Sequence, residues 1–139
     1  MYVDTSILVK LLVAEPDSEI CAAKVAGASV VSSELAYAET FSALLQKERA
    51  GAISASRRNL SWAEFERQIG EEAIFLASLD TSIVQRAQNL MFGLHPRVPL
   101  RTLDALHLAT CLSVIAGPLY TNDGRMKEAA RLLDIPLVE

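Results

Sequence analysis

The sequence predicts an α/β fold, a three-layer α/β/α sandwich around a mainly parallel central sheet. Short apolar or β-branched runs alternate with helical patterns from one end of the chain to the other, and this alternation is typical of parallel strands joined by helical crossovers. The chain has 139 residues and no internal repeat or linker-like stretch. At this length one hydrophobic core forms without disulfides or structural metals. We therefore expect a single domain over residues 1–139.

Strands are expected where a short apolar or β-branched run is bounded by small polar residues, glycine or proline. The runs are residues 2–3, 29–32, 73–77, 118–121 and 135–138. The last of them contains Pro136, which lacks a backbone donor and is tolerated in an edge strand. We therefore expect the final strand at one edge of the sheet.

Helices are expected between these strands, over residues 7–12, 18–25, 33–50, 54–70, 81–91, 102–115 and 126–133. Thr5 or Ser6 can cap the first helix, and Glu15-Pro16 should end it. The fourth helix begins either near Ser54 or Ser56, or later at the capping-box pattern of residues 61–64. The helix from Thr102 to Ile115 is apolar on nearly all sides, which indicates a buried helix.

The helix at residues 33–50 carries the clearest amphipathic pattern. Tyr37, Phe41, Leu44 and Leu45 share one face, which we expect to meet the core. Glu39 flanks that face in an early turn of the helix, so its carboxylate can reach the end of a neighbouring strand. Residues 93–101, with two prolines, are expected to form the one long loop.

Composition limits the class of protein. The chain has 13 Lys and Arg against 17 Asp and Glu, a net charge of −4, whereas nucleic-acid-binding domains are usually basic. A cluster of acids that binds divalent cations would lower this charge without excluding a phosphate substrate. Cys21 and Cys111 lie in apolar helical patterns and are expected to be reduced core residues of a cytoplasmic protein. No run is long enough for a membrane span, and the strand at Tyr2 leaves no room for a secretion signal.

Four acids follow predicted strands or begin predicted helices. Asp4 and Asp123 follow strands, Glu39 lies near the start of a helix, and Asp104 lies in the first turn of the buried helix. Each has an ordinary alternative role as a helix cap or turn residue, although Thr102 already offers a cap beside Asp104. Since ligands bind beyond the carboxyl ends of parallel strands, we expect the four acids to line one crevice.

Several carboxylates in one crevice repel each other unless a cation lies between them. Oxygen-only ligands favour Mg²⁺ or Mn²⁺ over zinc. Carboxylate-bound Mg²⁺ suits phosphodiester hydrolysis, because the ion polarises phosphoryl oxygens and activates water. The four acids therefore predict a metal-dependent hydrolase site.

Four segments, in order along the whole chain, resemble the PIN domain family and its VapC-like toxin branch: YVDTSILVK, SELAYAETFSALL, LDALHLATC and LYTNDGRMKEAARLLDIPLV. The resemblance implies a Mg²⁺- or Mn²⁺-dependent endoribonuclease that cleaves RNA with metal-activated water. It also implies a homodimer and a cognate antitoxin. It assigns metal binding to Asp4, Glu39, Asp104 and Asp123, with Thr5, Ser6 and Thr121 as supporting hydroxyls.

Other residues receive simpler interpretations. Basic residues outside the acid cluster are expected to contact RNA: Lys10, Arg57, Arg58 and Arg101. His107 lies one turn beyond Asp104 on the buried helix, where a histidine is more often a hydrogen-bonded packing residue than a catalytic one. Glu34 is interpreted as a helix-capping residue.

Two other functions remain open. A catalytically silent PIN-like module would bind RNA or a protein partner without metal-dependent cleavage. A phosphoacceptor signalling domain could use Asp80 after the third strand. Such a domain needs paired acids after the first strand and a lysine after the last, whereas this chain has a single Asp4 and no lysine beyond Lys127.

Overall fold

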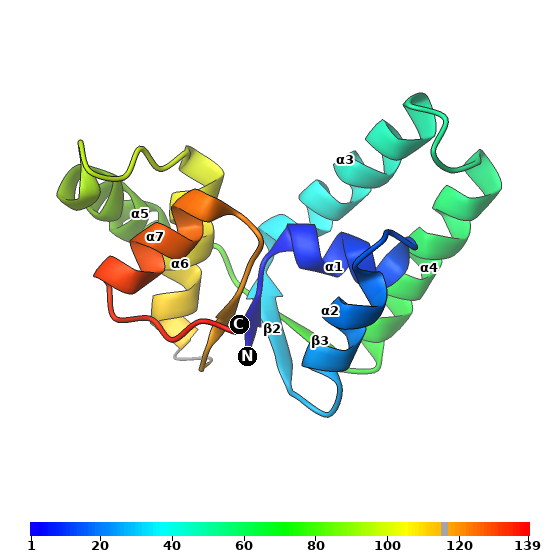
Figure 1. Ribbon diagram of the computed structural model, residues 1–139, viewed down its shortest axis with the longest axis horizontal. Coiled ribbons are helices and arrows are strands. Elements are labelled where there is room, and N and C mark those ends of the chain that lie inside the picture. Colours follow the sequence, from blue (N-terminus) through cyan, green and yellow to red (C-terminus); the bar gives the residue numbers. More distant parts are fainter. Residues whose placement is uncertain (115–116) are drawn as a thin grey trace.

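A short parallel sheet forms the centre of the molecule (Figure 1), whose computed structural model describes residues 1–114 and 117–139. Its four strands lie in the order β3-β2-β1-β4. They are β1 (Tyr2–Val3), β2 (Val30–Ser33), β3 (Ile74–Ala77) and β4 (Leu119–Tyr120), and every pair is parallel. Around them, the described residues form helices α1 (Thr5–Leu12), α2 (Ser18–Val25), α3 (Leu35–Arg49), α4 (Ala55–Gly70), α5 (Thr81–Leu94), α6 (Thr102–Val114) and α7 (Gly124–Leu132).

Alternating strand residues build a core on each face of the sheet. Val3 and Tyr120 pack into the core that α1 to α4 cover. Tyr2 and Leu119 point the other way, into the core formed with α6 and α7, and α5 packs on the outer side of α6. Helices α1 to α4 thus lie on one side of the sheet and α5 to α7 on the other (Figure 1). The predicted three-layer α/β/α arrangement is confirmed.

The core-facing side of α3 differs from the prediction. Ala36, Thr40 and Leu44 are its buried residues, whereas Tyr37 is 43% exposed. Tyr37 and Phe41 instead stack edge-on against Trp62 of α4, at centroid distances of 5.0 and 4.9 Å. The small side chains bring α3 close to the core, and the aromatic ones join it to α4 in a long hairpin.

Several element ends also differ from the prediction. Helix α4 takes the earlier start, because Ser54 caps it by accepting a hydrogen bond from the Arg57 N–H. Helix α5 continues through Gly93 to Leu94. The expected final strand is reduced to one parallel bridge between Leu119 and Leu137, consistent with the missing donor of Pro136. Ile115, predicted as the end of the buried helix, lies outside the described residues.

The strand order places a crevice beyond the carboxyl ends of the strands. Strand β1 pairs with β2 on one side and β4 on the other, with Tyr2 opposite Val31 and Val3 opposite Tyr120. The chain therefore leaves β1 toward one side and returns to pair with it from the other, which is a topological switch point. Residues that follow β1 and β4 meet there. In the described ranges, no helix is long and apolar enough to cross a membrane.

Truncating Phe65 tests the α3–α4 hairpin. Phe65 of α4 is fully buried, whereas Phe75 of β3 is 61% exposed. We expect Phe65→Ala to lower the free energy of unfolding by about 3–5 kcal/mol, because it removes a ring and leaves a cavity. The matched control Phe75→Ala should cost less than about 1 kcal/mol, since little packing is lost. Urea denaturation of both variants measures the difference, and equal losses would contradict this description of the core.

Candidate active site

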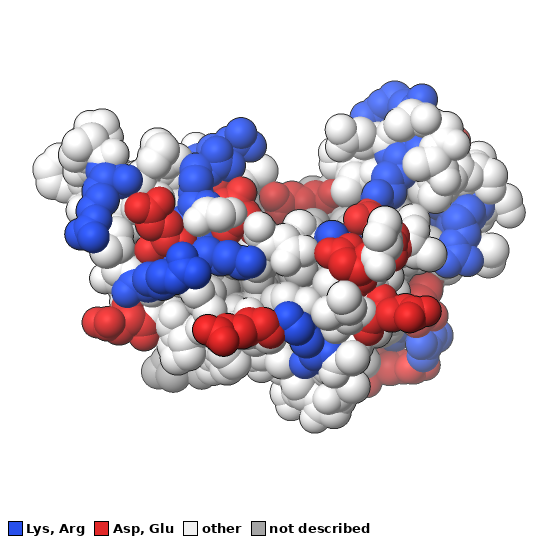
Figure 2. All heavy atoms as spheres, viewed as in Figure 1, with Lys and Arg blue, Asp and Glu red and all other residues white. Residues whose placement is uncertain are grey.

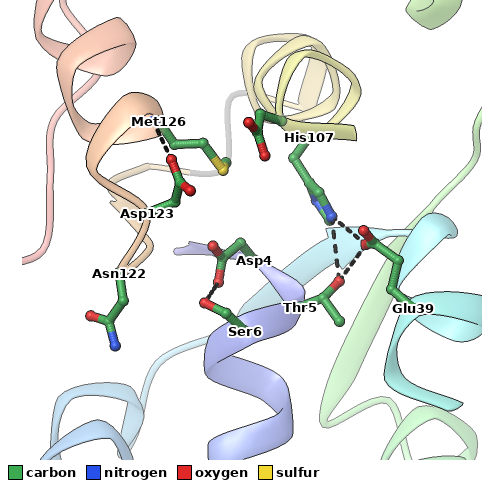
Figure 3. A pocket seen from close by; sticks show the side chains of 9 residues that line it. Asp4, Thr5, Ser6, Glu39, His107, Asn122, Asp123 and Met126 are labelled. Carbon is green, nitrogen blue, oxygen red and sulfur yellow. Dashed lines mark hydrogen bonds and ion pairs between the residues drawn. The ribbon is translucent and has the colours of Figure 1, made fainter. Parts of the chain in front are cut away.

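A cavity of about 310 Å³ opens where β1 and β4 end. Helices from both faces of the sheet contribute to its wall (Figure 3). It is lined by Asp4, Thr5, Ser6, Glu39, Asp104, His107, Asn122, Asp123 and Met126. The structure therefore brings the four predicted acids to one cavity, although they are up to 119 residues apart in sequence, from Asp4 to Asp123.

Asp4 is held at the centre of this cavity by hydrogen bonds to both carboxylate oxygens. It is only 4% exposed. Its Oδ1 accepts from Ser6 Oγ at 2.7 Å and from the Ile7 N–H at 3.1 Å, and its Oδ2 accepts from Thr121 Oγ1. The expectation that Thr5 or Ser6 caps α1 is wrong, because Asp4 is itself the N-cap. Capping and hydroxyl bonds together stabilise the buried charge.

Glu39 enters the cavity from the side of α3. Its Oε2 accepts hydrogen bonds from Thr5 Oγ1 at 2.6 Å and from His107 Nε2 at 2.7 Å (Figure 3). Partial burial pushes the pKa of Glu39 upward, but the bonds from His107 and Thr5 outweigh burial and lower that pKa below its usual value. Glu39 is therefore ionised at neutral pH.

Asp104 and Asp123 lie on the side of α6 and α7, and both bind backbone donors at helix starts. Asp123 caps α7 by accepting from the N–H groups of Arg125 and Met126 at 2.8 and 2.9 Å. Asp104 Oδ2 accepts from the Arg101 N–H at 3.2 Å. The expectation that Thr102 relieves Asp104 of capping is therefore wrong. Thr102 is the first residue of α6, and Asp104 reaches back to the residue before it.

Arg125 provides a counterion for these two acids that the sequence reasoning missed. Its Nη2 lies 3.2 Å from Asp123 Oδ2, and its Nε lies 3.4 Å from Asp104 Oδ2. The signal was an arginine in the first turn of the helix that Asp123 caps. A side chain there can fold back toward the helix N-terminus and the residues in front of it.

The acids surround the cavity without forming a compact ligand cluster. Across residues 1–114 and 117–139, no three His, Cys, Asp or Glu side chains are grouped closely enough to hold a metal ion. The donor set is nevertheless made of carboxylate, hydroxyl and amide oxygens, which suit a hard divalent cation. The residues present therefore fit Mg²⁺ or Mn²⁺ by chemistry, and Arg125 lies beside two of the acids.

The predicted RNA-contacting residues divide into two groups. Lys10 pairs with Asp17 at 2.5 Å and Arg58 pairs with Glu48 at 2.6 Å, so acids neutralise these two. Arg57 and Arg101 are exposed. The space-filling view is hollowed between the α5–α7 side and the α3–α4 hairpin, with acidic atoms in the hollow and basic side chains on both flanks (Figure 2). The surface around the hollow therefore carries both acidic and basic side chains.

Three other ionisable residues were candidates for a role in the site, and the structure gives the contacts of each. His107 is a buried packing residue as expected, but it also contacts Glu39. Glu34 accepts a hydrogen bond from the Leu79 N–H at 3.0 Å, so it joins the loop after β3 to the start of α3. Asp80 caps α5 by binding the Ile83 N–H and does not line the cavity. This position gives no support to the phosphoacceptor hypothesis.

Replacing Arg125 tests its role as a counterion. We expect Arg125→Gln to lower the free energy of unfolding of the metal-free protein by about 1 kcal/mol at low ionic strength, because Asp104 and Asp123 lose a shared cation. Screening should shrink this difference in about 0.5 M NaCl. Lys127→Gln on the same helix is the control, since Lys127 has no ion pair within the described residues. Denaturation at two salt concentrations measures both variants, and a loss that does not depend on salt would contradict the counterion role.

Comparison with known proteins gives matches over most of the chain. A model of the PIN domain family matches residues 1–132. A protein of Mycobacterium tuberculosis (strain ATCC 25618 / H37Rv), named ribonuclease VapC46, is 39% identical over 142 residues, which cover 99% of this chain and 95% of that protein. In the solved structure of a toxin–antitoxin complex from Klebsiella pneumoniae, one chain matches with a TM-score of 0.60 and 16% identity, over 88% of this chain and 85% of that one. The last match concerns the fold alone.

Proposed function

The chain belongs to the PIN domain family, and we propose that it is a metal-dependent endoribonuclease, the toxin of a toxin–antitoxin pair. One observation carries this proposal: Asp4, Glu39, Asp104 and Asp123 line a single cavity at the switch point of the sheet. The relative named as a ribonuclease spans nearly the whole chain, which supports the same activity. The substrate is RNA, and the bond broken is a phosphodiester.

The proposed cofactor is Mg²⁺ or Mn²⁺, held by Asp4, Glu39, Asp104 and Asp123. When bound, such an ion supplies a Lewis acid for the phosphoryl oxygens and lowers the pKa of water. The chain supplies the orientation of the ligands. Ser6 and Thr121 fix both oxygens of Asp4, and Thr5 fixes Oε2 of Glu39. Fixed ligands need little reorganisation, which is the general advantage of a preorganised site.

The RNA backbone is proposed to lie along the hollow beside the acids. Arg101 is exposed next to Asp104, and Arg57 is exposed on α4. Both can contact phosphates, and such contacts give affinity without reading the base sequence. Lys10 and Arg58 are weaker candidates, because Asp17 and Glu48 already neutralise them.

Substitution of single acids tests the function. We expect Asp4→Asn and Asp104→Asn each to reduce Mn²⁺-dependent RNA cleavage at least about 100-fold, since each loses a charged ligand but keeps a side chain that can cap a helix. Asp134→Asn is the matched control, because Asp134 is exposed and lies outside the cavity. Cleavage of a labelled RNA by pure protein and Mn²⁺ calorimetry are the measurements. A silent PIN-like module would show neither acid-dependent cleavage nor acid-dependent Mn²⁺ binding.

A cognate antitoxin is the proposed protein partner. The acidic cavity is complementary to a basic side chain, and Arg125 shows that a guanidinium fits between Asp104 and Asp123. The structural neighbour from Klebsiella pneumoniae comes from a toxin–antitoxin complex, which agrees with such a partner. An antitoxin that places an arginine or lysine here would neutralise the acids that the reaction needs.

A homodimer is proposed from exposed apolar side chains on α5 and α6. Phe92 is 81% exposed and Val84 is 51% exposed on α5, and Leu103 at the start of α6 is 45% exposed. Large apolar side chains exposed on two packed helices are candidates for an interface. We expect light scattering to give twice the monomer mass for the wild type and the monomer mass for Phe92→Glu. Leu60→Glu on α4 is the control, and a dimer that survives Phe92→Glu would place the interface elsewhere.

A further inference from the structure

A buried row of polar groups connects β1 to the acid cavity through α6. The Tyr2 hydroxyl lies 2.8 Å from His107 Nδ1, and His107 Nε2 lies 2.7 Å from Glu39 Oε2. Tyr2 is fully buried and His107 is 4% exposed. Three elements from different layers, β1, α6 and α3, thus meet through one imidazole. Polar groups buried this deeply remain only where each has a hydrogen-bond partner.

The partners determine which imidazole nitrogen carries a hydrogen. Glu39 is ionised and can only accept, so Nε2 must donate to it. Burial raises the pKa of the Tyr2 phenol, so its O–H remains and can donate to Nδ1. A neutral ring therefore has its hydrogen on Nε2, and a charged ring has one there as well. The hydrogen bond to Glu39 does not depend on the charge of His107.

The two donors to Glu39 share one oxygen. Both Thr5 Oγ1 and His107 Nε2 bind Oε2, whereas the hydrogen bonds of the described residues leave Oε1 without a protein donor. The carboxylate is therefore held from one side (Figure 3). Oε1 is the atom that remains for a ligand in the cavity.

We propose that His107 is a positioning residue, which fixes Glu39 by an Nε2–H···Oε2 bond so that Oε1 serves as the metal ligand, with Tyr2 holding the imidazole in place. This inference deepens the proposed function, because it assumes that Glu39 binds the metal. Histidine acts here on a ligand and not on the substrate. Groups that orient a ligand in this way typically change metal affinity about 10- to 100-fold when removed.

Nitrogen-15 NMR tests the hydrogen position without any metal or substrate. The chain has two histidines, and His95 is exposed in the segment after α5, so tag-free protein gives two distinguishable ring systems. We expect Nε2 of His107 to carry a hydrogen at neutral pH, with His95 exchanging between tautomers. A His107 ring with hydrogen only on Nδ1 would overturn the proposal, even if the protein cleaves RNA.

Mn²⁺ calorimetry on variants tests the consequence for the site. His107→Leu should weaken Mn²⁺ binding about 10- to 100-fold, because it keeps the ring's apolar packing but removes the donor. His107→Gln should retain most of the affinity, since its amide N–H can replace Nε2–H. Ser61→Ala is the control, a buried hydroxyl on α4 whose one hydrogen bond within the described residues goes to Leu12 O. Equal affinities for the Gln and Leu variants would overturn the positioning role, whereas a wild type that binds no Mn²⁺ would instead overturn the proposed function.

Discussion

A buried carboxylate at the end of the central strand is the constraint on which the rest of the site depends. Asp4 is almost inaccessible to solvent, and a buried charge costs free energy unless donors surround it. Two donors come from the start of α1, and the third is the Thr121 hydroxyl just after β4. Thr121 reaches Asp4 because β1 and β4 are parallel neighbours with Val3 opposite Tyr120. The strand register thus determines the geometry at the centre of the cavity.

Negative charge around the cavity is balanced differently on its two sides. Near α6 and α7, the guanidinium of Arg125 lies beside Asp104 and Asp123. Near α3, hydrogen bonds from Thr5 and His107 hold Glu39. A divalent cation that entered would therefore compete with Arg125 for one pair of acids. For Asp4 and Glu39 it would compete with no lysine or arginine of the described residues.

The sequence was sufficient for the arrangement of the site but not for its hydrogen bonds. The alternating strand and helix patterns predict that Asp4 and Asp123 follow strands. Because the strands are parallel, the residues that follow them meet at the carboxyl end of the sheet. The capping roles were assigned to the wrong neighbours, because Thr5, Ser6 and Asp4 all have good capping chemistry. Only the structure decides which of them takes the backbone donor.

Other differences have a similar physical cause. The aromatic face of α3 satisfied the amphipathic pattern, yet Tyr37 packs on a neighbouring helix and Ala36 faces the core. Hydrophobic periodicity indicates which face of a helix is buried. It does not indicate whether a sheet or a second helix covers that face. Local spacing indicates the pair of Arg125 with Asp123, but not the link from Arg125 to Asp104, which joins residues of different helices.

Three of the four acids also begin helices, which gives them a role independent of chemistry. Asp4 and Asp123 are N-caps, and Asp104 accepts from the backbone N–H before α6. Selection for a stable fold alone would keep Asp, or Asn in its place, at these positions in a descendant that had lost activity. Glu39 caps no helix, and its hydrogen-bond partners Thr5 and His107 line the same cavity. Its replacement by a residue that is not acidic would therefore be the first mark of an inactive relative.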